Sequence, residues 1–329
     1  MPQLDFVDHA EIKREVLAHP VFSGGSLKFV RSFSAEHSRL LEYTLKSNSG
    51  IRSIVIKHQV SVPDAARATT QEFENLNKLY RILGSHFARS VPEPLAALPE
   101  RGILITSKVP GTPFAITLKK YGNRLCGSFC SSFVGEKARM VGIWLKNFQD
   151  ATRDEPLAFA KGLFLAEIER RLSRLQAKGF EPDLAPEILK RVAFQAAALD
   201  GQLVPTAARH GDFIAQNILI DHDAVGVVDF ESFTEKQAVY DDLGMFLGYL
   251  LVLGTSLPYS RLCLDAVGHG FLEGFRKDNT IDQSFLNIYI LKGMIRIITD
   301  GPSPKNKWGR LGVVGKLTKA LECVASRSI

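Results

Sequence analysis

The chain has 329 residues, of which 45% are hydrophobic and 23% are charged. These values lie near the globular average and exclude collagen-like, low-complexity and largely disordered classes. The formal net charge is +6, but residues 291–329 alone hold eight basic and two acidic side chains, so the rest of the chain is close to neutral. A nucleic-acid-binding protein usually spreads basic residues over one face of its fold, so we expect no nucleic-acid partner.

Neither the cysteines nor the apolar segments indicate an exported or membrane-spanning protein. Residues 1–22 contain four acidic side chains and no apolar segment of the kind found in a secretory signal. The longest apolar run, residues 243–257, is shorter than the ~20 residues of a spanning helix, so we expect a buried helix there. The cysteines are too few and too scattered for a disulfide scaffold, and we expect reduced thiols in a cytoplasmic protein. They are Cys126, Cys130, Cys263 and Cys323.

The first third of the chain predicts an antiparallel sheet followed by a helix. A capping pattern at Asp8 opens a short helix that ends before Pro20. Three strand-like runs follow, and the turn at residues 47–50 joins the second to the third. An apolar period of 3.6 residues then predicts a helix up to Gly84, and a further short strand follows. The predicted strands are residues 27–33, 39–46, 51–57 and 103–105.

Beyond the Pro-Gly-Thr-Pro break at residues 110–113, helical periods dominate. We expect one strand pair within this helical region, at residues 217–220 and 225–230, and helices again from Asp242. The pattern predicts an α+β protein with a small strand-rich lobe, residues 1–108, and a larger helical lobe, residues 109–329.

The strongest chemical signal is the segment from His210 to Asn217, followed by Asp229-Phe230-Glu231. Asp212 and Asn217 are five residues apart, and Asp229 comes twelve residues later at the end of the predicted hairpin. This is the H-x-D-x-x-x-x-N and D-F-x arrangement of phosphoryl transfer. One carboxylate accepts the proton of an attacking hydroxyl, while an amide oxygen and a second carboxylate hold Mg²⁺ against nucleotide phosphates.

The strand-rich lobe offers a lysine and a glutamate for the same chemistry. Lys57 ends the third predicted strand, where a phosphate-binding lysine is expected. The next helix offers Glu72 and Glu74 as partners for that lysine. Glu72 lies on the apolar stripe of the helix with Leu76 and Leu79, so we choose Glu72 as the ion-pair partner.

Each of these residues also has an ordinary explanation. Asp212 and Asn217 are common turn residues, and Asp229 suits the end of a strand. Lys57 and Glu72 are residue types that often lie on a solvated surface. The combined spacing favours the catalytic interpretation.

These motifs resemble the aminoglycoside phosphotransferase and choline kinase family, which are small-molecule relatives of the protein kinases. The resemblance rests on Lys57, Glu72, the 210–217 segment, the 229–231 segment and Asp241-Asp242-Leu243. It implies a bilobal, protein-kinase-like α+β fold and the transfer of the γ-phosphate of ATP, or of GTP, to a hydroxyl of a small molecule.

The resemblance also implies a role for each matching residue. Asp212 would be the catalytic base, with His210 bracing its loop. Asn217 and Asp229 would hold Mg²⁺, and Asp242 would fix the loop from the start of a helix, unless it is a plain helix cap. Lys57 and Glu72 would serve the phosphates. Residues 105–111, with Ser107 and Val109 among them, would hold the adenine.

The sequence departs in places from protein kinases and from the family that it resembles. Twelve residues separate Asp229 from Asp242, which leaves no room for an activation segment, and Gly211 stands where protein kinases carry an arginine. We therefore expect no peptide substrate. The loop that should cover the phosphates, residues 34–38, contains no glycine, and Gln149 stands where the family's helix carries a histidine.

The acceptor is expected to be a sugar, an amino alcohol, an antibiotic or a lipid-linked intermediate. Residues 212–242 hold eight acidic side chains and one basic one, but several of the acids belong to the expected magnesium site. The basic tail around Trp308 argues against a polycationic acceptor and predicts weak contact with a membrane surface, unless it is simply a solvated terminus. The alternative function is a weakly active or inactive kinase-like scaffold, which the glycine-free loop would favour.

Overall fold

The computed structural model describes residues 9–34, 38–47, 50–59, 64–123, 128–177, 184–254, 259–276 and 281–300. The predictions for the cap at Asp8, the turn at 48–49, the phosphate-covering loop at 35–37 and the basic tail from 301 onwards lie outside the described residues. The chain forms two compact units, one ending at Pro110 and one beginning at Gly111.

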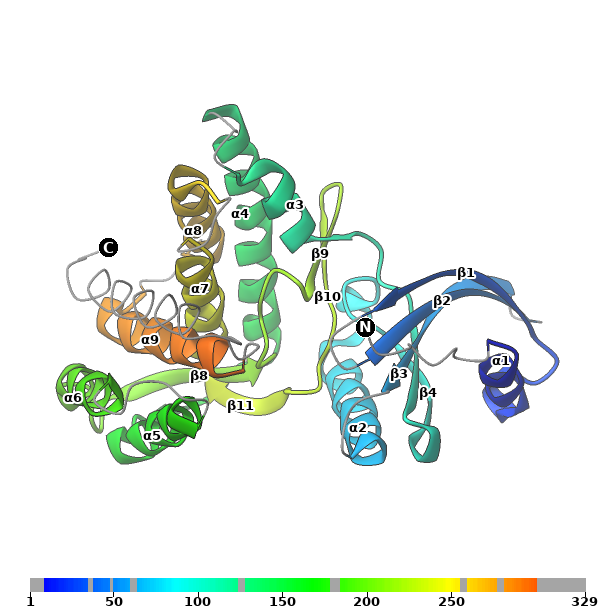
Figure 1. The fold of residues 1–329 in the computed structure, drawn as a ribbon, viewed down its shortest axis with the longest axis horizontal. Coiled ribbons are helices and arrows are strands. Elements are labelled where there is room, and N and C mark those ends of the chain that lie inside the picture. Colours follow the sequence, from blue (N-terminus) through cyan, green and yellow to red (C-terminus); the bar gives the residue numbers. More distant parts are fainter. Residues whose placement is uncertain are drawn as a thin grey trace. The chain divides into compact units, whose positions relative to one another are not determined.

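The N-terminal unit contains a five-stranded antiparallel sheet in the order β1-β2-β3-β5-β4 (Figure 1). The predicted strands are present, and β4 is an additional edge strand that the sequence analysis did not predict. In chain order the elements are α1 (His9–Ala18), η1 (Pro20–Phe22), β1 (Ser26–Ser34), β2 (Ser38–Ser47), β3 (Gly50–Gln59), α2 (Ala65–Leu83), η2 (Gly84–Phe87), β4 (Pro94–Leu98), η3 (Pro99–Arg101) and β5 (Ile103–Ser107).

The period of two along these strands builds the core of this unit. Leu41, Tyr43 and Leu45 alternate along β2 and are each 1% exposed, while Ile54 and Ile56 of β3 are fully buried. Side chains at every second position share one face of a strand, so these residues form a single apolar layer. Ile12 and Val16 of α1 belong to the same cluster. The intervening residues, Lys57 among them, are left on the opposite face of the sheet.

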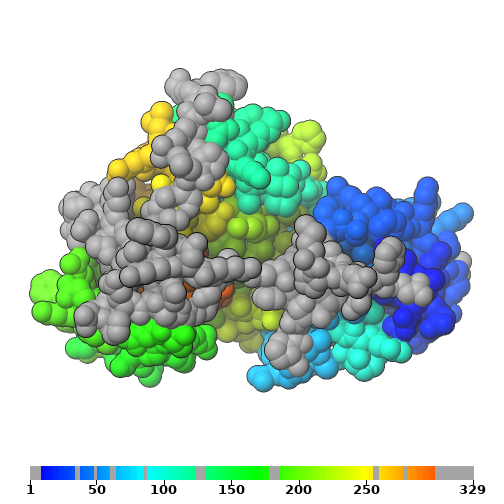
Figure 2. All heavy atoms as spheres, viewed as in Figure 1, coloured from blue at the N-terminus to red at the C-terminus, as the bar shows by residue number. Residues whose placement is uncertain are grey.

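The C-terminal unit is mainly helical. Its elements are β6 (Thr112–Pro113), α3 (Phe114–Tyr121), α4 (Ser128–Ala151), β7 (Asp154–Ala158), α5 (Lys161–Ala177), α6 (Leu184–Ala197), β8 (Leu203–Arg209), β9 (Ile218–Asp221), β10 (Ala224–Val227), β11 (Thr234–Ala238), α7 (Tyr240–Gly254), α8 (Arg261–Arg276) and α9 (Gln283–Asp300). In the space-filling view, the green atoms of α5 and α6 lie at the surface of this unit (Figure 2).

The prediction of a single strand pair in the helical region was wrong. β9 and β10 pair as expected, but β6 extends that sheet, and β7, β8 and β11 form a second three-stranded sheet. The segment Asp154–Ala158 is exposed throughout and has no alternation of apolar and polar residues. Because edge strands of this kind bury no face, hydrophobic periodicity does not reveal them.

Glycines bring two pairs of helices into backbone contact. A Cβ on Gly142 of α4 would lie 2.0 Å from the carbonyl oxygen of Phe271, and one on Gly274 of α8 would lie 2.0 Å from that of Arg139. Gly244 of α7 and Gly293 of α9 approach each other's helices in the same way. Close helix packing of this kind leaves no room for a side chain at the crossing point, so each glycine is required by space.

Two further features bear on the predictions about the environment of the protein. Among the described helices, none is both long and apolar enough to cross a membrane. Residues 243–254 of the longest apolar run lie in α7, which is buried up to Leu250. Cys130 and Cys263 form no disulfide, and Cys126 and Cys323 lie outside the described residues.

Candidate active site

The predicted catalytic loop, residues 210–217, connects β8 to β9 in the C-terminal unit. Gly211 has a φ of 88°, in the left-handed region, and a Cβ on it would lie 2.3 Å from the carbonyl oxygen of Ser232. Only glycine fits this position. Phe213 is fully buried and stacks on Trp144 of α4, with ring centroids 6.0 Å apart, so the loop is anchored to the helical core.

His210 is fully buried and stabilises the loop from within. Its Nδ1 accepts a hydrogen bond from the backbone N–H of Asp212 at 3.1 Å, and its Nε2 lies 2.9 Å from the carbonyl oxygen of Val228. Since the Val228 oxygen can only accept, Nε2 carries the proton and donates it. Burial lowers the pKa of His210, which agrees with this neutral tautomer. His210 therefore ties the Asp212 backbone to the residue before Asp229.

Asn217 closes the loop over Asp212. Its Nδ2 donates to both the backbone oxygen and the Oδ2 of Asp212, each at 2.9 Å. This fixes the orientation of the amide, because the nitrogen must face these acceptors. Burial raises the pKa of the Asp212 carboxyl, and the charge of Arg296 opposes that rise. A half-buried carboxylate with a raised pKa has the properties of a general base.

Asp229 lies beside Asn217 because the hairpin brings their backbones together. The N–H of Val228 donates to the carbonyl oxygen of Asn217 at 2.9 Å. Asp229 has a φ of 70°, which non-glycine residues adopt rarely and which costs roughly 1–3 kcal/mol. Strained residues of this kind cluster at functional sites. The pair offers an amide oxygen and a carboxylate, which are oxygen ligands of the type that Mg²⁺ prefers.

The start of α7 holds the beginning of the loop. The carboxylate of Asp242 accepts hydrogen bonds from the backbone N–H groups of His210 and Gly211, at 2.7 and 2.9 Å. Burial raises the pKa of Asp242 to about 6. Asp242 therefore acts on the loop, as the resemblance implied, and is not a plain cap of its own helix.

A buried ionic cluster adjoins this contact. Asp241 lies 2.6 Å from Arg209 and 2.8 Å from Lys292 of α9, and Lys292 also pairs with Glu167 of α5 at 2.9 Å. Burial alone would raise the pKa of Asp241, but Lys292 and Arg209 hold it well below its ordinary value. The cluster joins α5, α7 and α9 to the residue that precedes the catalytic loop.

In the N-terminal unit the structure joins Lys57 to Glu72. The Lys57 Nζ lies 2.7 Å from the Glu72 Oε2, and the side chains are 14% and 5% exposed. Glu74, the other candidate, is exposed. β3 pairs with β5 so that Lys57 faces Leu104, three residues before Ser107.

Ser107 and Val109 lie at and beyond the end of β5. The N–H of Ser107 donates to the carbonyl oxygen of Glu93 at 2.9 Å, and its Oγ accepts from the N–H of Glu93 at 2.8 Å. Val109 is 6% exposed. The Ser107 N–H and hydroxyl therefore serve the fold.

The sequence analysis missed two ionic clusters, one around Glu42 in the N-terminal unit and one around Lys292 in the C-terminal unit. Glu42 of β2 is 4% exposed and accepts from Lys108 and Arg31, at 2.5 and 2.8 Å. Lys292 interrupts the apolar run Ile290-Leu291-Lys292-Gly293-Met294, and a lysine in such a run is a usable signal of a buried ion pair. For Glu42 no comparable signal exists, because its partner Lys108 is 66 residues away.

The two-unit α+β fold, with a small antiparallel sheet and a catalytic loop beside a strand hairpin, defines a kinase-like phosphotransferase. The model of the phosphotransferase enzyme family matches residues 42–277, and the chain belongs to that family. A comparison with curated protein sequences finds no match.

Solved structures of kinase-like enzymes share the fold. The ternary complex of APH(2″)-IIa with streptomycin and ATP is 18% identical, with a TM-score of 0.56 and 97% of each chain covered. A choline/ethanolamine kinase family protein from Mesorhizobium loti is 13% identical, with a TM-score of 0.56 and coverage of 97% of this chain and 95% of that one. A thermostable mutant of APH(4)-Ia with ADP and hygromycin B is 12% identical, with a TM-score of 0.59 and coverage of 97% and 100%.

These findings confirm the predicted family, the fold class and the assignment as an enzyme. The chain is a small-molecule phosphotransferase.

Proposed function

We propose that this enzyme transfers the γ-phosphate of ATP to a hydroxyl group of a small molecule, with Asp212 as the general base. The observation that carries the proposal is the geometry of the catalytic loop. The Asn217 side chain binds the Asp212 carboxylate while its backbone carbonyl accepts from Val228, so one residue holds both the base and the residue before Asp229. Such fixed positioning supports catalysis by orientation and electrostatics.

Asp212 is proposed to accept the proton of the acceptor hydroxyl. Its carboxylate is half-buried, and its Oδ2 is oriented by the Asn217 amide at 2.9 Å. Asp242 and His210 keep the loop backbone in place through hydrogen bonds to its first three N–H groups. These contacts hold the Asp212 carboxylate in one position.

Asn217 and Asp229 are proposed to hold Mg²⁺. The donor set fits the ion, because the Asn217 nitrogen faces Asp212, which leaves the amide oxygen as the ligand atom, and Asp229 adds a carboxylate. When bound, Mg²⁺ neutralises charge on the nucleotide phosphates. The residues themselves fix the position of the ligand atoms through the Asn217–Val228 backbone pair.

Lys57 is proposed to bind a phosphate of the nucleotide, with Glu72 holding the lysine in place. Its ammonium group is oriented by the 2.7 Å ion pair and by its position near the end of β3. The Ser107 carbonyl and the Val109 backbone are proposed to bind the adenine. The complexes of relatives with ATP and ADP support ATP as the nucleotide.

The acceptor is proposed to be a hydroxyl of a sugar, an amino alcohol, an antibiotic or a lipid-linked intermediate. The known complexes in this fold contain streptomycin, hygromycin B and spectinomycin, which supports hydroxyl-bearing acceptors in general. The reaction breaks the bond between the γ-phosphorus and its bridging oxygen and forms a phosphate ester with the acceptor oxygen.

Thermal unfolding with Mg²⁺-ATP tests the proposal. A ligand at a hundredfold its Kd adds about 2.7 kcal/mol to the stability of the folded state. We expect this shift in the wild type and its loss in Asp229→Asn, because asparagine tolerates the left-handed backbone while removing the charge. Asp223→Asn is the matched control, since Asp223 is 98% exposed in the turn of the same hairpin.

The same experiment tests the preference for ATP over GTP and the alternative function as a scaffold. Mg²⁺-GTP, added in parallel, should produce a smaller shift than Mg²⁺-ATP. An equal shift in the wild type and in Asp229→Asn would contradict the metal assignment. Absence of any shift at millimolar nucleotide would favour a kinase-like scaffold without nucleotide binding.

A further inference from the structure

A cavity of about 640 Å³ lies in the C-terminal unit, apart from the catalytic loop. Its walls come from the end of α4, the start of β7, the start of α7 and the segments around Phe275 and Ile281. Asp212, Asn217 and Asp229 do not line it. Small-molecule sites usually have volumes of roughly 300–1,000 Å³, so this cavity is large enough for a ligand.

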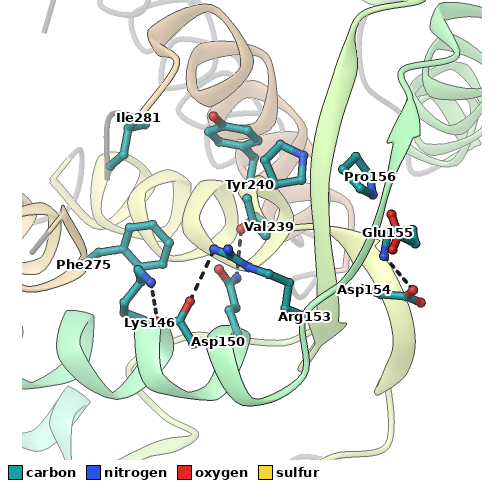
Figure 3. A pocket seen from close by; sticks show the side chains of 12 residues that line it. Lys146, Asp150, Arg153, Asp154, Glu155, Pro156, Val239, Tyr240, Phe275 and Ile281 are labelled. Carbon is teal, nitrogen blue, oxygen red and sulfur yellow. Dashed lines mark hydrogen bonds and ion pairs between the residues drawn. The ribbon is translucent and has the colours of Figure 1, made fainter. Parts of the chain in front are cut away.

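The apolar part of the wall comes from several elements. Tyr240 and Phe275 are each 5% exposed, and Val239, next to Tyr240 in the chain, is half-buried. Figure 3 shows Phe275 and Ile281 on one side of the cavity, Pro156 on the other and Tyr240 between them. Such a wall suits the ring or branched chain of an apolar ligand.

Gln149 provides an unsatisfied hydrogen-bond acceptor in this wall. The residue is 4% exposed, and its Nε2 donates to the carbonyl oxygen of Val239 at 2.9 Å. A reversed amide would place two oxygens together, so the orientation is fixed. Its Oε1 is buried and has no hydrogen-bond partner among the described residues. Buried acceptors are almost always paired, so a donor is expected from a ligand or from a water molecule.

The charges at the α4 end favour an anion. Lys146, Asp150 and Arg153 follow one another on or just beyond the end of α4, and the Asp150 carboxylate is shared by both basic side chains. Arg153 is 63% exposed, and only its Nη2 approaches Asp150, at 3.5 Å. A guanidinium has five N–H donors, so Arg153 retains the capacity to bind a carboxylate or a phosphate.

The acidic residues of the cavity do not reverse this preference. Asp150 is already engaged by Lys146 and Arg153. Asp154 is engaged by Lys236 at 3.2 Å and by the N–H of Glu155 at 2.6 Å. Asp154 and Glu155 belong to β7 and lie on the Pro156 side of the view, away from Lys146 and Asp150 (Figure 3). Glu155 has no ion pair among the described residues, but it lies with Asp154 on the β7 side (Figure 3). At the α4 end Lys146 and Arg153 share the single carboxylate of Asp150, which leaves one excess positive charge there for the head group of an anion.

We propose that this cavity is a second, non-catalytic ligand site for an amphipathic anion, with an apolar ring body against Phe275 and Tyr240. Arg153 binds its carboxylate or phosphate head, and Gln149 accepts a hydrogen bond from a hydroxyl on the ring. Val239 and Tyr240 directly precede Asp241 and Asp242, so a ligand here contacts the segment that leads into the residues holding the catalytic loop.

Binding of matched probes to the full chain tests the site without nucleotide, so the result is independent of the proposed reaction. The probes share one ring: 4-hydroxyphenylacetate, 4-hydroxyphenyl phosphate, tyramine and phenylacetate. We expect at least one of the two hydroxylated anions to bind in a ligand-observed NMR titration, and the tighter of them identifies the head group. Tyramine should bind at least about tenfold more weakly, because its charge is reversed, and phenylacetate should bind several-fold more weakly than its hydroxylated counterpart.

Arg153→Gln should weaken binding of the anion at least about tenfold, because it removes the charge-assisted contact. Arg191→Gln is the matched control, since Arg191 is a 44% exposed arginine of α6 that also pairs with a carboxylate. It should leave the Kd unchanged within about twofold, since surface ion pairs contribute little. Equal binding of tyramine, an equal effect of the two arginine variants, or no binding of either hydroxylated anion at 20 mM, about twentyfold the Kd of a millimolar ligand, would overturn the proposal.

Discussion

The catalytic loop of the C-terminal unit and the lysine–glutamate pair of the N-terminal unit are assembled in different ways. The catalytic loop is held by several hydrogen bonds, which come from within the loop, from the Val228 carbonyl and from Asp242 at the start of α7. Lys57 and Glu72 come from a strand and a helix, and one ion pair at 2.7 Å joins them. The loop therefore carries its own geometry, whereas the lysine depends on the packing of the sheet and α2.

The largest expected effect is in the loop. Asp212→Asn should lower kcat by about 10²–10⁴-fold, the usual contribution of a general base. Nucleotide affinity should be retained, because an asparagine can still accept the hydrogen bond from Asn217. ADP release, measured with the acceptor that gives the highest wild-type turnover, checks the first expectation, and thermal unfolding with Mg²⁺-ATP checks the second. A variant that keeps more than a tenth of the wild-type kcat would contradict the role of Asp212.

The second effect concerns the contribution of the Asp241–Lys292–Glu167 ionic cluster to the stability of the fold. Lys292→Met should lower the free energy of unfolding by about 3–5 kcal/mol at pH 7, because it removes the shared partner of buried Asp241 and half-buried Glu167. Urea unfolding measures the change. Lys236→Met is the control, since Lys236 is 32% exposed and pairs with an exposed carboxylate. It should cost at most about 1 kcal/mol, and equal losses in both variants would contradict the importance of burial.

The same variant has a defined pH dependence. Lys292 and Arg209 lower the pKa of folded Asp241, so the unfolded chain binds more protons than the folded chain at acidic pH. The stabilisation is therefore complete above about pH 5 and is lost as the pH falls below about 4, near the pKa of an unfolded aspartate. The difference between wild type and Lys292→Met should shrink over that range. The pKa of Asp242 is raised to about 6, so its ionisation lowers the stability of the folded state as the pH rises towards and past 6. Asp242 is present in both proteins, so this contribution cancels in the difference between them.

The smallest expected effect is a change in the KM for nucleotide, which should differ between variants of Glu72 and Glu74 in α2. Glu72→Gln should raise the KM for nucleotide about tenfold, or about 1.4 kcal/mol, because Lys57 loses its charged partner. Glu74→Gln should have no measurable effect, since Glu74 is exposed on the same helix. Initial-rate kinetics at varied ATP compares them. Identical KM values for the two variants would show that Lys57 does not need Glu72 for its position.

The elements with strong local signals could be predicted from the sequence. The alternating residues of β2 and β3, the hairpin of β9 and β10 and the spacing of Asp212, Asn217 and Asp229 all depend on neighbours close along the chain. The β7–β8–β11 sheet was missed, because its two edge strands have no apolar period: β7 is exposed throughout, and β11 is mostly half-buried with only Ala238 buried. The Glu42–Lys108 pair was missed because it depends on sheet register between distant segments.

The candidate site shows the same division. The choice of Glu72 over Glu74 followed from helical periodicity, and the structure places Glu72 against Lys57. The use of the Ser107 N–H and hydroxyl by Glu93 could not be foreseen, because that contact forms only when β4 and β5 pair. The link from Asp241 to Lys292 also requires α7 and α9 to pack, 51 residues apart in the numbering.

The glycine contacts between α4 and α8 have a consequence for the second cavity. Gly142 of α4 lies against the backbone of α8, and Gly274 of α8 lies against the backbone of α4, so the two parallel helices pack as one stiff block. Gln149 and Phe275 lie near the same end of this block. Walls fixed in this way lose little conformational entropy when a ligand enters. The cavity should therefore select its ligand by shape, with similar on-rates for compounds that fit and sharp rejection of ring substituents that do not.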